Sequence, residues 1–332
     1  MATLSVKNPT LLDLAKMQDP NGTIADVVEM MNEVNDVLDD MTWQEGNLPT
    51  GHRSTIRTGI PDPTWRKLYG GVQPNKGTTV QVTDSCGMLE AYAEVDKALA
   101  DLSGDAAKFR LTEDRAHIEG ISQEVADTLF YGNETTEPEA FTGLAPRFNS
   151  TTAANGENVI LGGGAGTDNA SIWLIGWSPM TVFGIIPKGS KAGMQIKDLG
   201  EVTNQNTDGS GGRSQQYMTH YRFDAGLCVR DWRYIVRIPN IDKSALTKNA
   251  SAGADLIDLL TQALEIIPSL SNCRPVFYTS RHVRSFLRRQ IANKVVNSTL
   301  AMDTVAGKRV LSFDGVPFKR VDALSADEAL VS

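Results

Sequence analysis

Apolar residues recur every three or four positions between Thr112 and Tyr131, a spacing typical of one face of a helix. This apolar stripe consists of Ile118, Ile121, Val125 and Leu129. The opposite face is polar and carries Glu113, Arg115, Glu119, Gln123 and Asp127. Thr112 suits the N-cap, and Gly132 suits a left-handed C-cap. The pattern predicts a helix of roughly 30 Å whose apolar stripe is buried within the chain.

Two more helices are predicted before this segment. The first is an arm helix with Ile24, Val27, Val28, Met31, Val34 and Leu38 on one face and acidic residues on the other. That acidic face either docks on a basic partner or, as we favour, faces solvent. The second helix carries Met88, Tyr92, Val95, Leu99 and Leu102.

The intervening residues 42–86 contain many prolines and glycines and two strand-like runs, His52–Thr58 and Thr78–Thr83. We expect a long two-stranded excursion with Trp65, Lys67 and Tyr69 near its tip. Because an isolated hairpin is barely stable in water, these side chains need a surface to pack on. That surface belongs either to this chain or to another copy of it.

The second half favours strands around a buried core. Two nearly continuous apolar runs, at residues 171–177 and 181–187, predict strands covered on both faces. Aromatic and β-branched residues predict more strand between His220 and Asn240, and alternation predicts a final hairpin with its turn at Asp314-Gly315. Helices are expected at residues 256–267 and 280–295, a buried strand at 275–279, and a hinge between two domains at residues 141–160.

Composition limits the classes of function. With 332 residues, the chain is long enough for about two domains. A formal net charge of −8 argues against a main surface for nucleic acid, although a local basic patch stays open. Cys86, Cys228 and Cys273 are odd in number and far apart, which favours reduced structural thiols. Neither a signal peptide nor a membrane-spanning run is present in the sequence.

No motif demands catalysis. The glycine run at residues 162–167 lacks the third glycine of a dinucleotide loop, and the segment from Gly184 misplaces the lysine of a phosphate-binding loop. The four histidines are scattered, although a triad assembled from distant residues stays open. We therefore predict no catalytic residue, cofactor or metal site.

One helix is basic. Arg281, Arg284 and Arg288 follow at spacings of three and four, and Arg289 adjoins them. Such a face can contact phosphates or an acidic neighbour, for example the arm helix of another subunit. The alternative, which we favour from the sequence alone, is a solvated basic face above an apolar stripe.

The order of elements resembles the major capsid proteins of tailed phages with the Hong Kong 97 phage capsid fold. It looks most similar to the family of short-tailed phages such as epsilon-fifteen and the Bordetella phage. The blocks that carry the resemblance are HIEGISQEVADTLFYGN at residues 117–133, PEAFTGLAPRF at 138–148, SIWLIGW at 171–177 and IIPKGSKAGMQIKDLGE at 185–201.

This resemblance implies an α+β fold with four parts. They are an N-terminal arm (residues 1–41), an extended E-loop hairpin (42–86), a P-domain with a long spine helix (87–150 and 300–332) and an A-domain (151–299). The implied function is a non-enzymatic major capsid protein that assembles as pentamers and hexamers into an icosahedral shell around double-stranded DNA. The alternatives are an encapsulin-like compartment shell and a cytoplasmic α/β enzyme with a dispersed site.

The resemblance also implies partners. The chain is expected to bind copies of itself, a separate scaffolding protein, a portal protein, a cement or decoration protein, and packaged DNA without sequence specificity. No membrane and no cofactor is expected, and the location is the virion after synthesis in the bacterial cytoplasm. The candidate subunit contacts are Trp65, Lys67, Tyr69, Arg281, Arg284, Arg288 and Arg289.

Overall fold

The structure, a computed structural model, describes residues 9–10, 13–14, 33–205, 212–246, 255–292, 300–305, 308–325 and 327–332. The chain divides into two compact units. The first contains Met1–Glu33, Met88–Val125 and Lys191–Asp224, and the second contains Val34–Gly87, Ala126–Ser190 and Ala225–Ser332. Most of the predicted arm helix lies outside the described residues. In its described part, residues 33–36 are not helical and Asn35 forms a β-bridge with Val321, so only the short helix α2 (Val37–Asp40) is helical there. The division into arm, E-loop, P-domain and A-domain stays a prediction.

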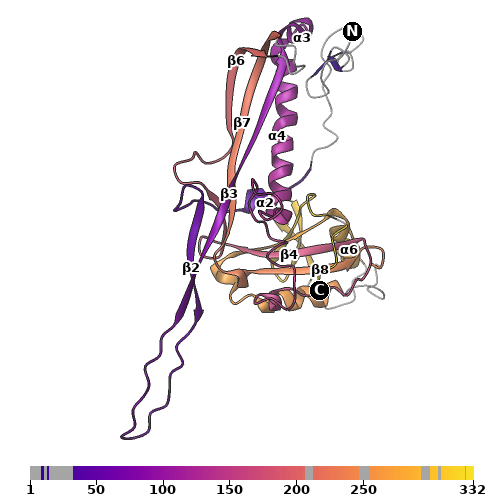
Figure 1. Cartoon of the computed structure of the whole chain (residues 1–332). Coiled ribbons are helices and arrows are strands. Elements are labelled where there is room, and N and C mark those ends of the chain that lie inside the picture. The colour runs from indigo at the N-terminus through magenta and orange to yellow at the C-terminus, as the bar shows by residue number, and fades with distance from the viewer. Residues whose placement is uncertain are drawn as a thin grey trace. The chain divides into compact units, whose positions relative to one another are not determined.

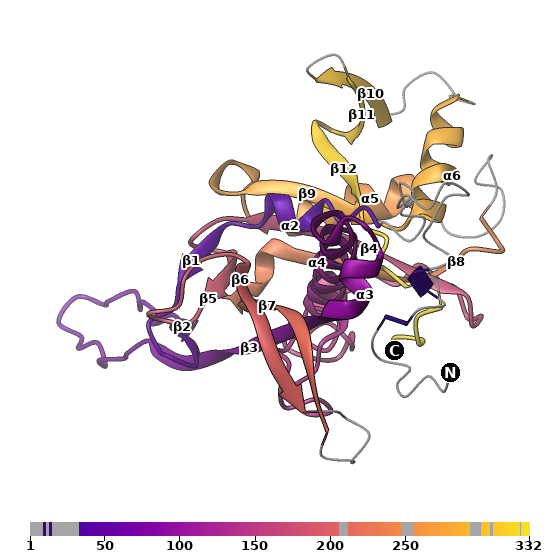
Figure 2. The ribbon, with the colours of Figure 1, turned by 90° about the horizontal axis from the view of Figure 1, so that it is seen from above.

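The second unit is built on a mixed sheet. Its strands are β1 (Trp43–Glu45), β2 (Gly51–Gly59), β3 (Thr78–Asp96, up to Gly87), β4 (Asn169–Trp177), β5 (Val182–Ile186), β7 (Arg213–Val229, from Ala225), β8 (Ile235–Asp242), β9 (Arg274–Thr279), β10 (Leu300–Val305), β11 (Lys308–Phe313) and β12 (Val316–Arg320). They follow the order β10-β11-β12-β9-β4-β5-β7-β3-β2, while β1 pairs with β5 and β8 with β4. Figure 2 shows the β10–β11 hairpin extending beyond β12.

The core of the second unit confirms the apolar runs of the second half. Every residue of β4 and β5 is buried, as expected for strands covered on both faces. Helices α5 (Leu256–Ile266) and α6 (Arg281–Ala292) contribute Leu260, Val283 and Leu287 to the same core as Phe277 of β9. At the predicted final turn, Asp314 and Gly315 have φ angles of 48° and 78°, which a tight hairpin turn requires.

The strand β3 overturns one predicted helix. Residues Met88 to Asp96 continue β3, which is 19 residues long, and only α3 (Lys97–Leu102) is helical. Apolar spacing of three and four was compatible with a helix, but Ala93 and Val95 are buried while Glu90 and Tyr92 are exposed, which is the period of a strand. Pairing with β7 decides between the two patterns, since strand preference depends on neighbours.

The first unit combines this end of β3 with a hairpin that the sequence did not reveal. Strand β6 (Gln195–Gln205) pairs antiparallel with β7, from Gln195 opposite Arg222 to Gln205 opposite Arg213. These strands lie alongside the long helix α4 (Ala106–Tyr131) in Figure 1. Val95, Leu99, Ala100 and Phe109 form a small core there.

The long helix is confirmed, but its beginning and one buried position were predicted wrongly. It begins at Ala106 and has 26 residues. Asp105 accepts a hydrogen bond from the Lys108 N–H at 3.0 Å, so Asp105 rather than Thr112 supplies the cap. Of the apolar stripe, Ile121, Val125 and Leu129 are buried, whereas Ile118 is 36% exposed.

The C-terminal end of α4 is capped by a returning segment. Gly132 does not have the left-handed backbone that was predicted. Instead, the N–H groups of Gly143, Leu144 and Ala145 donate to the carbonyl oxygens of Gly132, Leu129 and Phe130 at 2.8, 3.0 and 2.7 Å. The carbonyls that every helix leaves unpaired at its end are thus satisfied by backbone.

This close approach predicts opposite effects of alanine at two glycines. In Gly143→Ala, the new Cβ would lie 2.5 Å from the Thr128 carbonyl oxygen and displace the capping segment. Losing these hydrogen bonds should destabilise the protein by about 2–4 kcal/mol. Gly120→Ala is the matched control, because nothing lies within 4 Å of a Cβ at this position in α4. It should stabilise by roughly 0.5–1 kcal/mol. Thermal and urea unfolding measure both, and a wild-type midpoint for Gly143→Ala would contradict the capping role.

Candidate subunit-contact surfaces

The loop between β2 and β3, residues 60–77, exposes large apolar side chains. Trp65 is 100% exposed and Tyr69 98%. The Gly70 N–H donates to the Lys67 carbonyl oxygen at 3.0 Å, and Tyr69 has a φ of 64°, so these residues form a turn. Figure 1 shows the indigo loop continuing outward from the ends of β2 and β3. Lys67 and Tyr69 therefore belong to this turn, Trp65 lies two residues before it, and all three residues are exposed.

Two further apolar residues of this loop were missed. Ile60 is 82% exposed and Leu68 is 81% exposed. Neither belongs to an alternating or helical pattern, so nothing in the sequence distinguished them from buried residues. Several exposed apolar side chains close together in one loop are typical of interaction surfaces.

A second surface gathers the predicted arginines. Arg281, Arg284, Arg288 and Arg289 of α6 line a hollow of about 400 Å³ together with Ser285 and Arg320. We call this surface the arginine hollow. Arg320 was missed because it comes from β12, far along the chain from α6, and only the fold brings it there. Arg289 donates to the Ser285 hydroxyl at 3.2 Å and lies 4.3 Å from the ring centroid of Phe286.

Two charged groups have shifted pKa values, namely Arg284 of the arginine hollow and Asp322, which pairs with Arg281 and Arg320 of the hollow. Burial of the Asp322 carboxyl opposes its ionisation, but hydrogen bonds from Arg320, the Val34 N–H and Arg281 outweigh this effect and lower the pKa of Asp322. Burial, followed by repulsion from Arg288, lowers the pKa of the Arg284 guanidinium. The hollow is thus a place where positive charge is crowded.

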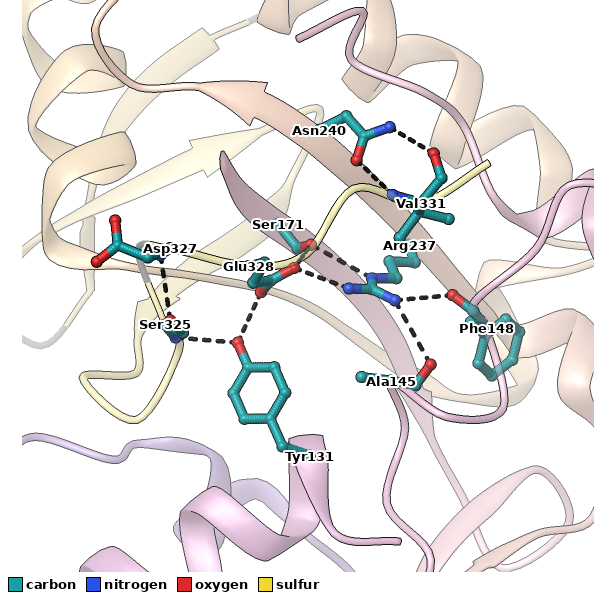
Figure 3. Close-up of polar contacts among 10 residues, drawn as sticks. All are labelled: Tyr131, Ala145, Phe148, Ser171, Arg237, Asn240, Ser325, Asp327, Glu328 and Val331. Atoms are coloured by element: carbon teal, nitrogen blue, oxygen red, sulfur yellow. Dashed lines mark hydrogen bonds and ion pairs between the residues drawn. The ribbon is translucent and has the colours of Figure 1, made fainter. Parts of the chain in front are cut away.

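A buried polar network holds the C-terminal residues against the sheet of the second unit (Figure 3). Arg237 Nη2 lies 2.7 Å from Glu328 Oε2, and the two side chains are only 5% and 4% exposed. The Tyr131 hydroxyl donates to Glu328 Oε1 at 2.6 Å, and the Ser171 hydroxyl donates to Glu328 Oε2. Burial, and then the Glu328 charge, raise the pKa of Tyr131, so this phenol stays protonated as a donor.

The same network extends to the backbone. Arg237 Nη1 donates to the Phe148 carbonyl oxygen at 2.9 Å. Asn240 donates to the Val331 carbonyl oxygen at 2.7 Å and accepts from the Val331 N–H at 3.0 Å (Figure 3). The network is mostly buried and positions chain segments, so we interpret it as structural. Sequence reasoning missed it, because its members are spread between residues 131 and 331.

In the first unit, exposed ion pairs join the helices to the β6–β7 hairpin. Lys97 Nζ lies 2.6 Å from Glu201, and Arg110 lies 2.7 Å from Asp198. The Gly200 N–H and then Arg110 lower the pKa of Asp198. Exposed ion pairs of this kind contribute little to the free energy of unfolding, so we expect them to orient the hairpin against the helices more than to stabilise the unit.

The glycine run at residues 162–167 has a structural explanation. In the glycine run, the N–H groups of Gly162 and Gly164 donate to the Pro239 and Asn240 carbonyl oxygens at 2.9 and 2.8 Å, so the run lies against β8. In the described ranges, no group of three His, Cys, Asp or Glu side chains could hold a metal ion. Likewise, none of the helices described is long and apolar enough to cross a membrane.

Comparisons with known proteins place these surfaces in context. The family model described as major capsid protein GP7 matches residues 19–332. Among solved structures, a chain of bacteriophage Epsilon15 has 38% sequence identity to this chain. The match covers 100% of this chain and 100% of that chain, with a TM-score of 0.78. The capsid of bacteriophage JBD30 is 10% identical over 97% of this chain and 100% of that chain, with a TM-score of 0.52, and shows the fold alone. None of the curated proteins matches the chain.

Proposed function

The chain belongs to the major capsid protein GP7 family, has the Hong Kong 97 phage capsid fold and is a shell-forming subunit; on this premise we propose that its copies assemble as pentamers and hexamers into an icosahedral shell around packaged double-stranded DNA. The observation that carries the proposal is the match over the full length of the Epsilon15 chain at 38% identity. The resemblance noted in the sequence is thereby confirmed at the level of the family.

Assembly in this proposal depends on the exposed loop between β2 and β3. Trp65, Leu68 and Tyr69 of this loop are exposed to water in the single chain. A neighbouring subunit that buried these side chains would be stabilised by the removal of apolar surface from water. The buried Arg237–Glu328 pair holds the C-terminal residues against the sheet of the second unit, which also carries this loop. The mechanism is geometric, and no chemical step is needed.

The proposal also includes other proteins of the phage particle. We infer a separate scaffolding protein, a portal protein and a cement or decoration protein, with the mature subunit in the virion after synthesis in the bacterial cytoplasm. The support is membership of a capsid family.

Electron microscopy tests the function directly. The full chain is expressed together with the scaffolding protein of the same phage, and negative-stain images of the particles are classified. We expect closed shells of uniform diameter that contain pentamers and hexamers. A stable monomer with enzymatic turnover and no shells would overturn the proposal, and shells that contain a protein cargo in place of DNA in infected cells would favour a cellular compartment.

A further inference from the structure

The arginine hollow contains more positive than negative charge. Its five guanidinium groups belong to Arg281, Arg284, Arg288, Arg289 and Arg320. Asp322 pairs with two of them, Arg281 and Arg320. Asp36 adds one more carboxylate, which favours the charged form of Arg284. In the part of the chain that the structure describes, two carboxylates therefore face five arginines, within a protein whose net charge is −8.

Arg284 shows most clearly why the hollow suits an anion. Its side chain is half-buried between the other arginines, and its Nε is buried with no hydrogen-bond partner among the described residues. Buried donors are normally satisfied, and an unsatisfied one marks a place where a ligand or partner can bind. An oxyanion in the hollow would accept from Arg284 and relieve the repulsion from Arg288.

The spacing along α6 fits a row of anions. Arg281 and Arg288 are seven residues apart, which corresponds to about 10 Å along a helix. One strand of duplex DNA carries a phosphate about every 3.4 Å of helix axis, and because the strand winds around this axis, a straight row of this length faces about two neighbouring phosphates. Guanidinium groups bind phosphate oxygens through two parallel hydrogen bonds, which makes arginine the suitable residue here.

We propose that the arginine hollow binds the phosphodiester backbone of the packaged DNA and therefore lies on the inner face of the shell. The inference rests on the proposed capsid function, and it adds a DNA-contact site to a subunit that is acidic overall. A competing occupant is an acidic surface of a neighbouring copy. The predicted acidic arm helix of a neighbouring copy, most of which lies outside the described residues, is such a surface, and the shell-formation arm of the test below distinguishes it from DNA.

DNA binding by the full chain tests the proposal. The anisotropy of a fluorescent 20-base-pair duplex (about two helical turns) is measured against protein concentration at several salt concentrations. The double variant Arg284→Gln/Arg288→Gln should bind at least about tenfold more weakly than wild type at low salt. The slope of log K against log salt should fall in magnitude by about two, because two phosphate contacts are lost. Arg284→Lys/Arg288→Lys keeps the charges and should retain most of the affinity.

The matched control removes two arginines from elsewhere. Arg57 of β2 and Arg115 of α4 are both exposed, so Arg57→Gln/Arg115→Gln changes the net charge equally. It should bind DNA within about twofold of wild type. All variants leave the buried Val283 and Leu287 of α6 intact, and circular dichroism checks the fold.

Three outcomes would overturn this inference. Wild-type DNA binding by the glutamine variant, or an equal loss in the control, would show that the hollow is not the DNA contact. Wild-type DNA binding combined with failure to form shells would assign the hollow to an acidic protein surface. Microscopy of the variants separates the two proposals, because normal shells with unchanged DNA binding contradict only the DNA contact.

Discussion

Replacing Trp65, Leu68 and Tyr69 together with serine is expected to abolish shell formation and to leave the fold of the subunit unchanged. These side chains are between 81% and 100% exposed in the single chain, so the substitutions remove nothing from its core. Burying each apolar side chain against a neighbour is worth roughly 1.5–3 kcal/mol. The variant would thus lose roughly 4.5–9 kcal/mol per subunit contact. A loss of about 1.4 kcal/mol already corresponds to a tenfold change in association.

Sedimentation velocity and negative-stain microscopy in the presence of scaffold would measure this loss. We expect unassembled subunits whose thermal midpoint equals that of the wild-type subunit. The matched control is Trp65→Phe/Leu68→Met/Tyr69→Phe, which keeps the apolar area and should form shells. If the serine variant forms shells in normal yield, the loop tip does not hold neighbours together.

The second half of the chain was predicted well because its signals are strong and local. The runs that became β4, β5 and β9 are rich in apolar residues over a short stretch, and the Asp-Gly pair at residues 314–315 is typical of a tight hairpin turn. The helices and strands of the first unit were harder to predict from the sequence. β6 is largely exposed and polar, so it lacks a buried face that would reveal a strand. At the end of β3, the apolar residues fit both a helical and a strand period, so the sequence predicts a helix, and only the pairing with β7 identifies the strand.

The candidate contact surfaces, too, could be predicted only where their residues are close in sequence. Trp65, Lys67 and Tyr69 could be predicted as a group because they are close in sequence and flanked by residues that break secondary structure. The arginines of α6 follow a helical spacing, but Arg320 joins them only because β12 pairs with β9, next to α6. Arg237 and Glu328 are 91 residues apart, and nothing in either local sequence predicts that each is buried with the other. Sequence patterns identify residues of one element, whereas sites shared by several elements need the fold.

Glu328→Ala should cause the largest loss of subunit stability of the changes considered. The substitution leaves the Arg237 guanidinium buried without its carboxylate, and the hydroxyl groups of Tyr131 and Ser171 without an acceptor. Removing one member of a buried ion pair typically costs about 3–5 kcal/mol. For a unit of this size, we expect the thermal midpoint to fall by roughly 10 °C. Since the network also positions the C-terminal residues through Asn240 and Val331, proteolysis should trim the C-terminus of the variant faster.

Two further variants distinguish the cost in stability of an unpaired buried charge from the cost of lost contacts. Arg237→Met/Glu328→Met removes both charges and should recover a large part of the stability, because an apolar pair of similar volume avoids the unpaired guanidinium. Asp327→Ala is the matched control from the same segment. Asp327 lies 3.2 Å from Lys243, but its side chain is 77% exposed, so its loss should cost no more than about 1 kcal/mol. A midpoint for Glu328→Ala equal to that of Asp327→Ala would show that the buried pair contributes no more than an exposed one.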